Sequence, residues 1–125
     1  MKTNLAQLFT PAAVTAVMLG AMGLASQAPV SALPFGPDTC AQGFVWREAI
    51  PSDHVCVTPD VRSRTAQENA TAVDRRDPNG AYGSNTCKSG FVWREAFNSD
   101  AVCVTPDIRS QTLADNASAA SRVAH

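Results

Sequence analysis

One stretch of this chain is present twice, and the duplication constrains the fold more than any other feature. Residues 34–75 align with residues 81–122 at a constant offset of 47, without a gap. The segment GFVWREA is identical in both copies, at Gly43–Ala49 and at Gly90–Ala96. Self-similarity at one fixed period indicates a repeated structural unit. With only two copies, we expect two small domains, residues 33–75 and 81–122, joined by a turn-forming linker at residues 76–80.

Each copy contains two cysteines, sixteen positions apart. Four cysteines allow three pairings, and the duplication selects the one in which each unit closes its own pair, Cys40–Cys56 and Cys87–Cys103. A zinc site built from all four thiolates is the alternative, but zinc ligands usually come in closely spaced pairs such as C-x2-C. Domains near 40 residues rarely bury enough apolar surface alone. A disulfide loop of this length contributes roughly 3 kcal/mol to stability in the chain-entropy model.

The local pattern within a copy predicts a hairpin followed by a helix. Residues 44–49 are rich in β-formers and predict a strand, Pro51–Asp53 predicts a turn, and Val55–Val57 predicts the return strand. Thr58-Pro59-Asp60 is typical of a helix start. We expect helices over residues 59–73 and 106–121. The predicted fold class is therefore α+β: two tandem ββα units, each stapled by one disulfide, with residues 123–125 as a frayed tail.

Alternation along the first predicted strand leaves two interpretations open. In one, Phe44 and Trp46 form a minimal core, and Glu48 at its edge pairs with Arg62 of the helix. In the other, the tryptophans are exposed stacking platforms for a sugar or peptide, with charged neighbours for polar contacts. The second interpretation makes six residues candidate ligand contacts: Trp46, Arg47, Glu48, Trp93, Arg94 and Glu95.

The helix carries one further polar candidate. Asn69 shares a helical stripe with Val61 and Thr65, and Asn116 repeats it. A half-buried Asn can satisfy main-chain groups of a small sheet, so we expect Asn69 to bond the hairpin backbone; an exposed Asn69 is the alternative.

Nothing in the sequence nominates a catalytic, metal or cofactor site. Asp53 lies in a turn and Asp60 at a helix start, where Asp is favoured for backbone reasons. Of this repeated set of three acids, only Glu48 and Glu95 lack such a reason, which makes them the acid pair to consider for paired-carboxylate chemistry. His54 is replaced by Ala101 in the second copy, so no Ser-His-Asp or Cys-His arrangement can be built in both units. We expect no enzyme activity, no metal and no cofactor.

The N-terminal segment predicts export. Lys2 is followed by an apolar run over residues 12–25, and small residues then precede Leu33, which is typical of a signal peptide over residues 1–32. An uncleaved anchor is the alternative, but the run is shorter than the roughly 20 apolar residues of a spanning helix. Without Lys2 the chain has 9 basic and 11 acidic side chains. This balance argues against nucleic acid as a partner, and no second apolar run predicts membrane insertion.

The run C-x2-GFVWREA-x3-D-x-VCVTP-x2-R resembles a module found in secreted actinobacterial proteins of unknown function. Both copies match it and together cover almost all of the mature chain. The resemblance implies export and residence outside the cell or in the cell envelope. It implies no particular ligand or catalytic residue.

These observations favour a non-catalytic extracellular or cell-envelope binding module. An envelope polysaccharide or protein is the expected partner, and two linked sites can gain avidity on a repetitive ligand. A structural or bioactive secreted miniprotein, with its tryptophans in the core, is the first alternative. A hydrolase is the second.

Overall fold

The computed structural model describes residues 33–125. The predicted signal peptide and its cleavage site lie outside the described residues. Both repeats lie within one compact unit of the chain, Pro37–Ala124, as two similar units.

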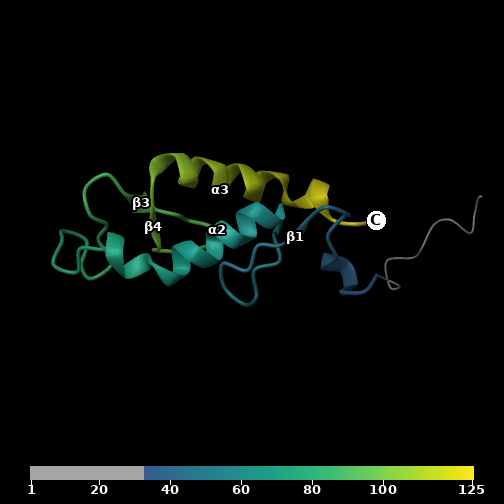
Figure 1. Ribbon diagram of the computed structural model, residues 1–125, viewed down its shortest axis with the longest axis horizontal. Coiled ribbons are helices and arrows are strands. Elements are labelled where there is room, and N and C mark those ends of the chain that lie inside the picture. The colour runs from purple at the N-terminus through teal and green to yellow at the C-terminus, as the bar shows by residue number, and fades with distance from the viewer. Residues whose placement is uncertain (1–32) are drawn as a thin grey trace, which may run out of the picture. The chain divides into compact units, whose positions relative to one another are not determined.

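Each repeat is a two-stranded antiparallel hairpin followed by a helix, which confirms the predicted α+β fold (Figure 1). In the first repeat β1 (Val45–Trp46) pairs with β2 (Cys56–Val57), and Val45 lies opposite Val57. The helical elements are α2 (Pro59–Ala70) and the 3-10 turn η4 (Ala72–Arg75). A short 3-10 turn, η3 (Gly36–Asp38), precedes the hairpin.

The second repeat reproduces this order at the offset of 47. It contains β3 (Val92–Trp93), β4 (Cys103–Val104), α3 (Pro106–Ser118) and the 3-10 turn η5 (Ala119–Arg122). Both predicted disulfides are formed, Cys40–Cys56 and Cys87–Cys103, each with its Cα atoms 5.6 Å apart.

The strands are shorter than the sequence predicts, because the backbone turns sharply after each tryptophan. Glu48 has a φ of 56° and Glu95 a φ of 59°. A non-glycine residue in this left-handed region cannot continue an extended strand. The strand predicted over residues 44–49 is therefore reduced to Val45–Trp46.

The helices begin where predicted but end earlier. Pro59 and Pro106 occupy first-turn positions, where a missing amide hydrogen costs nothing. The Thr105 hydroxyl also accepts a bond from the Ile108 amide at 3.4 Å. The last turn tightens into 3-10 geometry, as is frequent at helix ends.

The buried core is small and partly polar. Its apolar members are Ala49, Cys56, Val57, Ala72, Ala96, Cys103 and Val104. Phe44 and Trp46, which form the core in the first of the two interpretations, are only half-buried, whereas Arg47 is 2% and Arg94 1% exposed. The buried face of the hairpin is therefore the one that carries Arg47 and Ala49, two positions apart.

The helices α2 and α3 run in opposite directions, with the two hairpins at opposite ends (Figure 1). The predicted tail is not frayed: Val123 forms a β-bridge with Cys40, and the Ala124 amide donates to the Thr39 carbonyl at 2.8 Å. The predicted linker also contacts the second repeat, since Arg76 forms a β-bridge with Cys87 that is equivalent to the Cys40–Val123 bridge. Within residues 33–125 no helix has both the length and the apolar character needed to cross a bilayer.

Candidate ligand-binding site

The side chains of Arg47 and Arg94 are bonded inside the protein. The Arg47 guanidinium donates to Asp53 Oδ2 at 2.7 Å and Oδ1 at 3.1 Å, and also to Asn116 Oδ1 at 2.8 Å. It further donates to the Ala96 carbonyl at 3.1 Å. A bidentate arginine–carboxylate pair is strongly oriented. Both ions of this pair are buried, with side chains 2% and 5% exposed.

Arg94 repeats the arrangement from the second hairpin. Its guanidinium donates to Asp100 Oδ2 at 2.7 Å and Oδ1 at 3.2 Å. It reaches across to α2, where Glu68 Oε1 accepts at 3.1 Å and Asn69 Oδ1 at 3.0 Å. The sequence predicts Arg47 and Arg94 as ligand contacts, but their placement is structural because burial and internal bonds remove them from the ligand-accessible surface.

Asp53 organises the turn of the first hairpin around Arg47. Its carboxylate also accepts from the Ala49 amide at 3.0 Å and the Val55 amide at 3.3 Å. Burial raises the pKa of this carboxyl, but the hydrogen bonds from Arg47 and Ala49 and the charge of Arg47 outweigh that effect. The pKa of Asp53 therefore lies below its usual value, and the group stays ionised.

Glu48 and Glu95 remain at the surface, each paired with an arginine of the following helix. Glu48 Oε1 lies 2.7 Å from Arg62, as the first interpretation of the sequence expects, and Glu95 Oε1 lies 3.1 Å from Arg109. All four side chains are between 38% and 47% exposed. These pairs are open to solvent and can exchange partners with a ligand.

The two tryptophans are placed differently from each other. The ring of Trp46 stacks on His54, with centroids 3.8 Å apart and an interplanar angle of 17°. His54 Nδ1 lies 3.0 Å from Asp38 Oδ2, which holds the imidazole in place. One face of Trp46 is therefore covered by a side chain of its own repeat.

Trp93 has no such cover, because Ala101 stands where the first repeat has His54. Trp93 is 37% exposed, and its indole Nε1 donates to the Asn85 carbonyl at 2.8 Å. Tyr82, 77% exposed, meets it edge-on with centroids 6.2 Å apart. Together they line a cleft of about 400 Å³, here called the aromatic cleft, whose other lining residues are Thr86, Cys87, Phe91, Val92 and Arg109.

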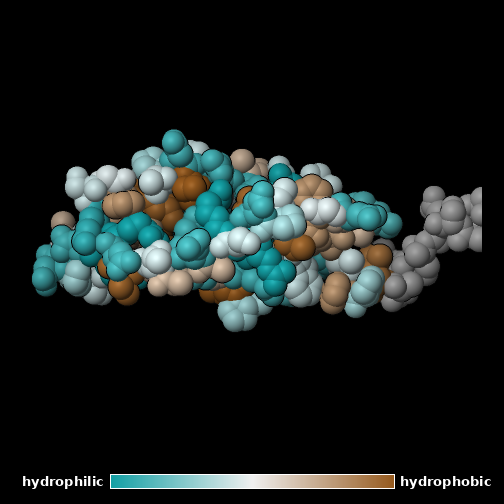
Figure 2. All heavy atoms as spheres, in the orientation of Figure 1, coloured by the Kyte–Doolittle hydropathy of each residue, from teal (hydrophilic) through white to brown (hydrophobic). Residues whose placement is uncertain are grey.

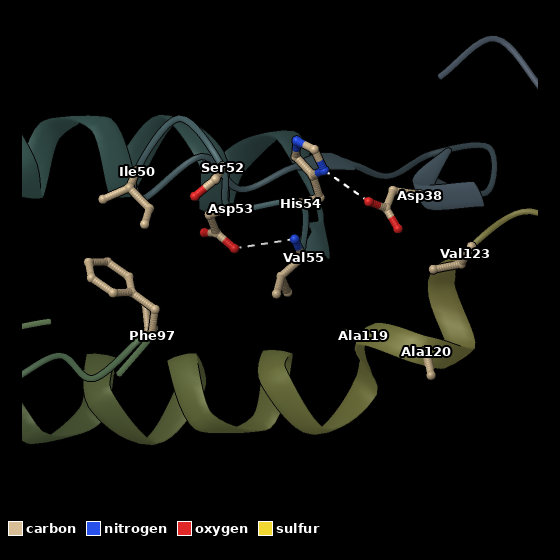
Figure 3. Close-up of a pocket in the computed structure, with 11 residues that line it drawn as sticks. Asp38, Ile50, Ser52, Asp53, His54, Val55, Phe97, Ala119, Ala120 and Val123 are labelled. Atoms are coloured by element: carbon tan, nitrogen blue, oxygen red, sulfur yellow. Dashed lines mark hydrogen bonds and ion pairs between the residues drawn. The ribbon is translucent and has the colours of Figure 1, made fainter. Parts of the chain in front are cut away.

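A second cleft, of about 470 Å³, lies between the first hairpin and the end of the second helix. Figure 3 shows Ile50 and Phe97 pointing toward one another across it, and Ala119, Ala120 and Val123 on the side of η5. Ile50 and Phe97 occupy equivalent positions of the two repeats. Because equivalent residues meet there, this cleft belongs to the boundary between the repeats.

The second cleft does not contain a catalytic triad. Asp38 and His54 are hydrogen-bonded, and Ser52 also lines the cleft. No hydrogen bond joins Ser52 to His54 in the described part of the chain, and Figure 3 shows the Ser52 hydroxyl directed away from the imidazole. Within the described residues no cluster of three or more His, Cys, Asp or Glu side chains could hold a metal ion.

Sequence reasoning did not identify Tyr82, Arg109 or the Asp38–His54 pair. Tyr82 and Arg109 lie 11 residues before and 16 residues after Trp93, so only the fold brings the three together. The signal for Asp38 was available: Asp38 and His54 both change in the second copy, to Asn85 and Ala101. The two copies differ at many other positions, so this pair of changes does not by itself identify the contact.

The hydropathy of the surface agrees with small, separate sites. Figure 2 shows hydrophobic atoms in separate groups between hydrophilic ones, one of them at the end where β3 and β4 lie.

No protein-family model matches the chain, and neither a curated protein nor a solved structure matches it.

Proposed function

We propose that this protein is a non-catalytic, exported binding module whose ligand is a polysaccharide of the cell envelope, held in the aromatic cleft. The observation that carries the proposal is the open Trp93–Tyr82 pair beside the exposed Arg109–Glu95 ion pair. No other part of the described chain combines two exposed aromatic rings with charged groups.

The chemistry of the cleft suits a sugar ring. An aromatic face packs against the apolar C–H groups of a pyranose, and neighbouring charged groups accept and donate bonds to its hydroxyls. Ligand sites typically enclose about 300–1,000 Å³, and the aromatic cleft is near the lower limit at about 400 Å³. A cleft of this size fits one or two sugar residues of a polysaccharide rather than a large ligand.

Export is part of this proposal. Two disulfides in so short a chain fit an oxidising compartment. The predicted signal peptide and the resemblance to secreted actinobacterial modules support location outside the cell or in its envelope.

The test is retention of the oxidised protein on insoluble envelope polysaccharide. Tyr82→Ala removes a ring that is 77% exposed, so it should leave the fold intact and reduce retention about tenfold or more. The substitution removes the stacking contact between the ring and the sugar, together with the apolar area that this contact buries. Trp93→Ala should reduce retention further.

Trp46→Ala is the matched control, because it removes the equivalent ring from the repeat in which His54 already covers one face. This variant should bind polysaccharide as the unchanged protein does. If Tyr82→Ala and Trp93→Ala bind unchanged, or if no envelope polysaccharide retains the protein, the aromatic cleft is not a glycan site.

A further inference from the structure

The two repeats contact one another through equivalent residues on both sides. The Arg75 guanidinium, at the end of the first repeat, donates from Nε to the Cys103 carbonyl in the second. At the offset of 47, Arg122 donates from Nη1 to the Cys56 carbonyl of the first, at 3.2 Å. Each helix end therefore binds the return strand of the other repeat.

The backbone shows the same reciprocity. Lys88 donates its amide to the Arg75 carbonyl at 2.9 Å, and Ala41 donates its amide to the Arg122 carbonyl at 2.8 Å. The bridges Arg76–Cys87 and Cys40–Val123 extend these two pairings. The end of each repeat thus forms one isolated β-bridge with a cysteine of the other repeat's disulfide.

The buried arginines also form hydrogen bonds across the boundary between the repeats. Arg47 reaches Asn116 on the opposite helix, and Arg94 reaches Asn69, the residue equivalent to Asn116. Arg64 donates to Gln111 Oε1 at 2.8 Å, and these two residues are themselves equivalent. A contact between equivalent residues lies on the axis of a two-fold arrangement.

An interface in which residue i contacts j while the copy of j contacts the copy of i is isologous, the kind found in symmetric homodimers. We propose that this face of each repeat is a self-association surface, and that the partner it fits is a second copy of the same repeat. The duplication supplies that partner within the chain, and a repeat of another chain can replace it. A covalent connection between the repeats is not required for the pairing.

The first test separates the repeats without unfolding them. A protease recognition sequence is inserted between Pro78 and Asn79, both exposed in the linker turn, and the oxidised full-length protein is cut there. Each disulfide lies within one repeat, so no covalent bond then joins the two halves. Native mass spectrometry should detect the two halves as one 1:1 complex. The cut protein should also keep the circular dichroism spectrum of the uncut protein.

Separation of the cut halves at micromolar concentration would overturn the proposal. If the insertion itself changes the circular dichroism before cutting, the same sequence is placed between Gly83 and Ser84, which are also exposed. The cut protein is then mixed with an isotope-labelled cut sample. Pairs that contain one labelled and one unlabelled half should form, and their absence after prolonged incubation would show that other chains do not supply partners.

The second test weakens the interface at one residue. Asn69→Ala removes the Arg94 contact across the boundary, and loss of a hydrogen bond to a charged group should raise the Kd of the cut pair about tenfold or more. Gln67→Ala is the control, because Gln67 is exposed on the same helix and is not the residue that accepts the Arg94 bond, so this variant should leave the Kd unchanged. Equal Kd values for both variants would contradict the assigned interface. Glycan retention is measured separately on the uncut protein, so failure of this proposal is distinguishable from failure of the proposed function.

Discussion

Two buried arginines occupy positions that aliphatic side chains fill in most small domains. Arg47 and Arg94 are the largest buried side chains of the described residues, and each forms a bidentate pair with an aspartate of its own hairpin turn. A buried charge is tolerated only where it is paired and its remaining donors are bonded. Here the remaining donors cross to the other repeat, so the same side chain closes the turn and joins the repeats.

Replacing Arg94 should therefore be costly. Arg94→Met leaves Asp100 buried without its charged partner and leaves Glu68 paired with Arg64 alone, and removal of one member of a buried pair typically costs 3–5 kcal/mol. We expect a loss of about that size in the free energy of unfolding, measured with urea.

Arg109→Met is the matched control. Arg109 pairs with Glu95 at the surface, its side chain is 38% exposed, and such pairs contribute at most about 1 kcal/mol. Equal losses for the two variants would show that the Arg94 network does not stabilise the fold.

At the scale of the element, each hairpin is held less by its strands than by the carboxylate in its turn. The strands have two residues each, and a hairpin that short is not stable alone in water. Asp53 bonds two amides of its own turn and the guanidinium of Arg47. The turn geometry therefore depends on the ionised form of one acid.

Acid should weaken the first hairpin for this reason. The folded state holds the pKa of Asp53 below its unfolded value of about 3.9. The contribution is complete above the unfolded pKa and is lost as the pH falls through the lower folded pKa. Unfolding experiments from pH 6 downward should show stability falling below about pH 4.

The Asp53→Asn variant should have a lower free energy of unfolding than the unchanged protein at neutral pH. That free energy should fall less in the variant as the pH is lowered. Asp74→Asn, which changes an exposed acid of η4, should keep the acid dependence of the unchanged protein. Parallel pH profiles for Asp53→Asn and the unchanged protein would contradict this assignment.

At the scale of the whole molecule, the end of the chain belongs structurally to the first repeat. Arg122 and Ala124 bond residues beside Cys40, and Val123 bridges to Cys40 itself. The end of the first repeat does the same for the second through Arg75 and Arg76. Neither ββα unit is complete without the other.

Removing residues 122–125 should thus destabilise the first repeat more than the second, to which these residues belong or adjoin in sequence. Without Arg122 the Ala41 amide loses its acceptor, so its hydrogen exchange should accelerate by at least tenfold. The equivalent Lys88 amide bonds Arg75 and should keep its protection. Faster exchange at Lys88 with no change at Ala41 would reverse the assignment.

Much of the local structure could be predicted from the sequence. The cysteine spacing and the duplication predicted both disulfides, and Thr-Pro-Asp predicted both helix starts, because these signals act between near neighbours. The pairing of Glu48 with Arg62 and the bond from Asn69 to the Ala49 carbonyl were also expected. The aromatic cleft could be predicted only in part, since Trp93 was a candidate while Tyr82 and Arg109 were not.

The ββα unit and its disulfide follow from periodicity, helix caps and cysteine spacing within one repeat, so they could be predicted from the sequence. The buried face of GFVWREA and the pairing of the two units depend on contacts between the repeats. Arg47 and Arg94 are buried because their last hydrogen-bond acceptors lie on the helix of the opposite repeat, at positions that no spacing within a single repeat specifies.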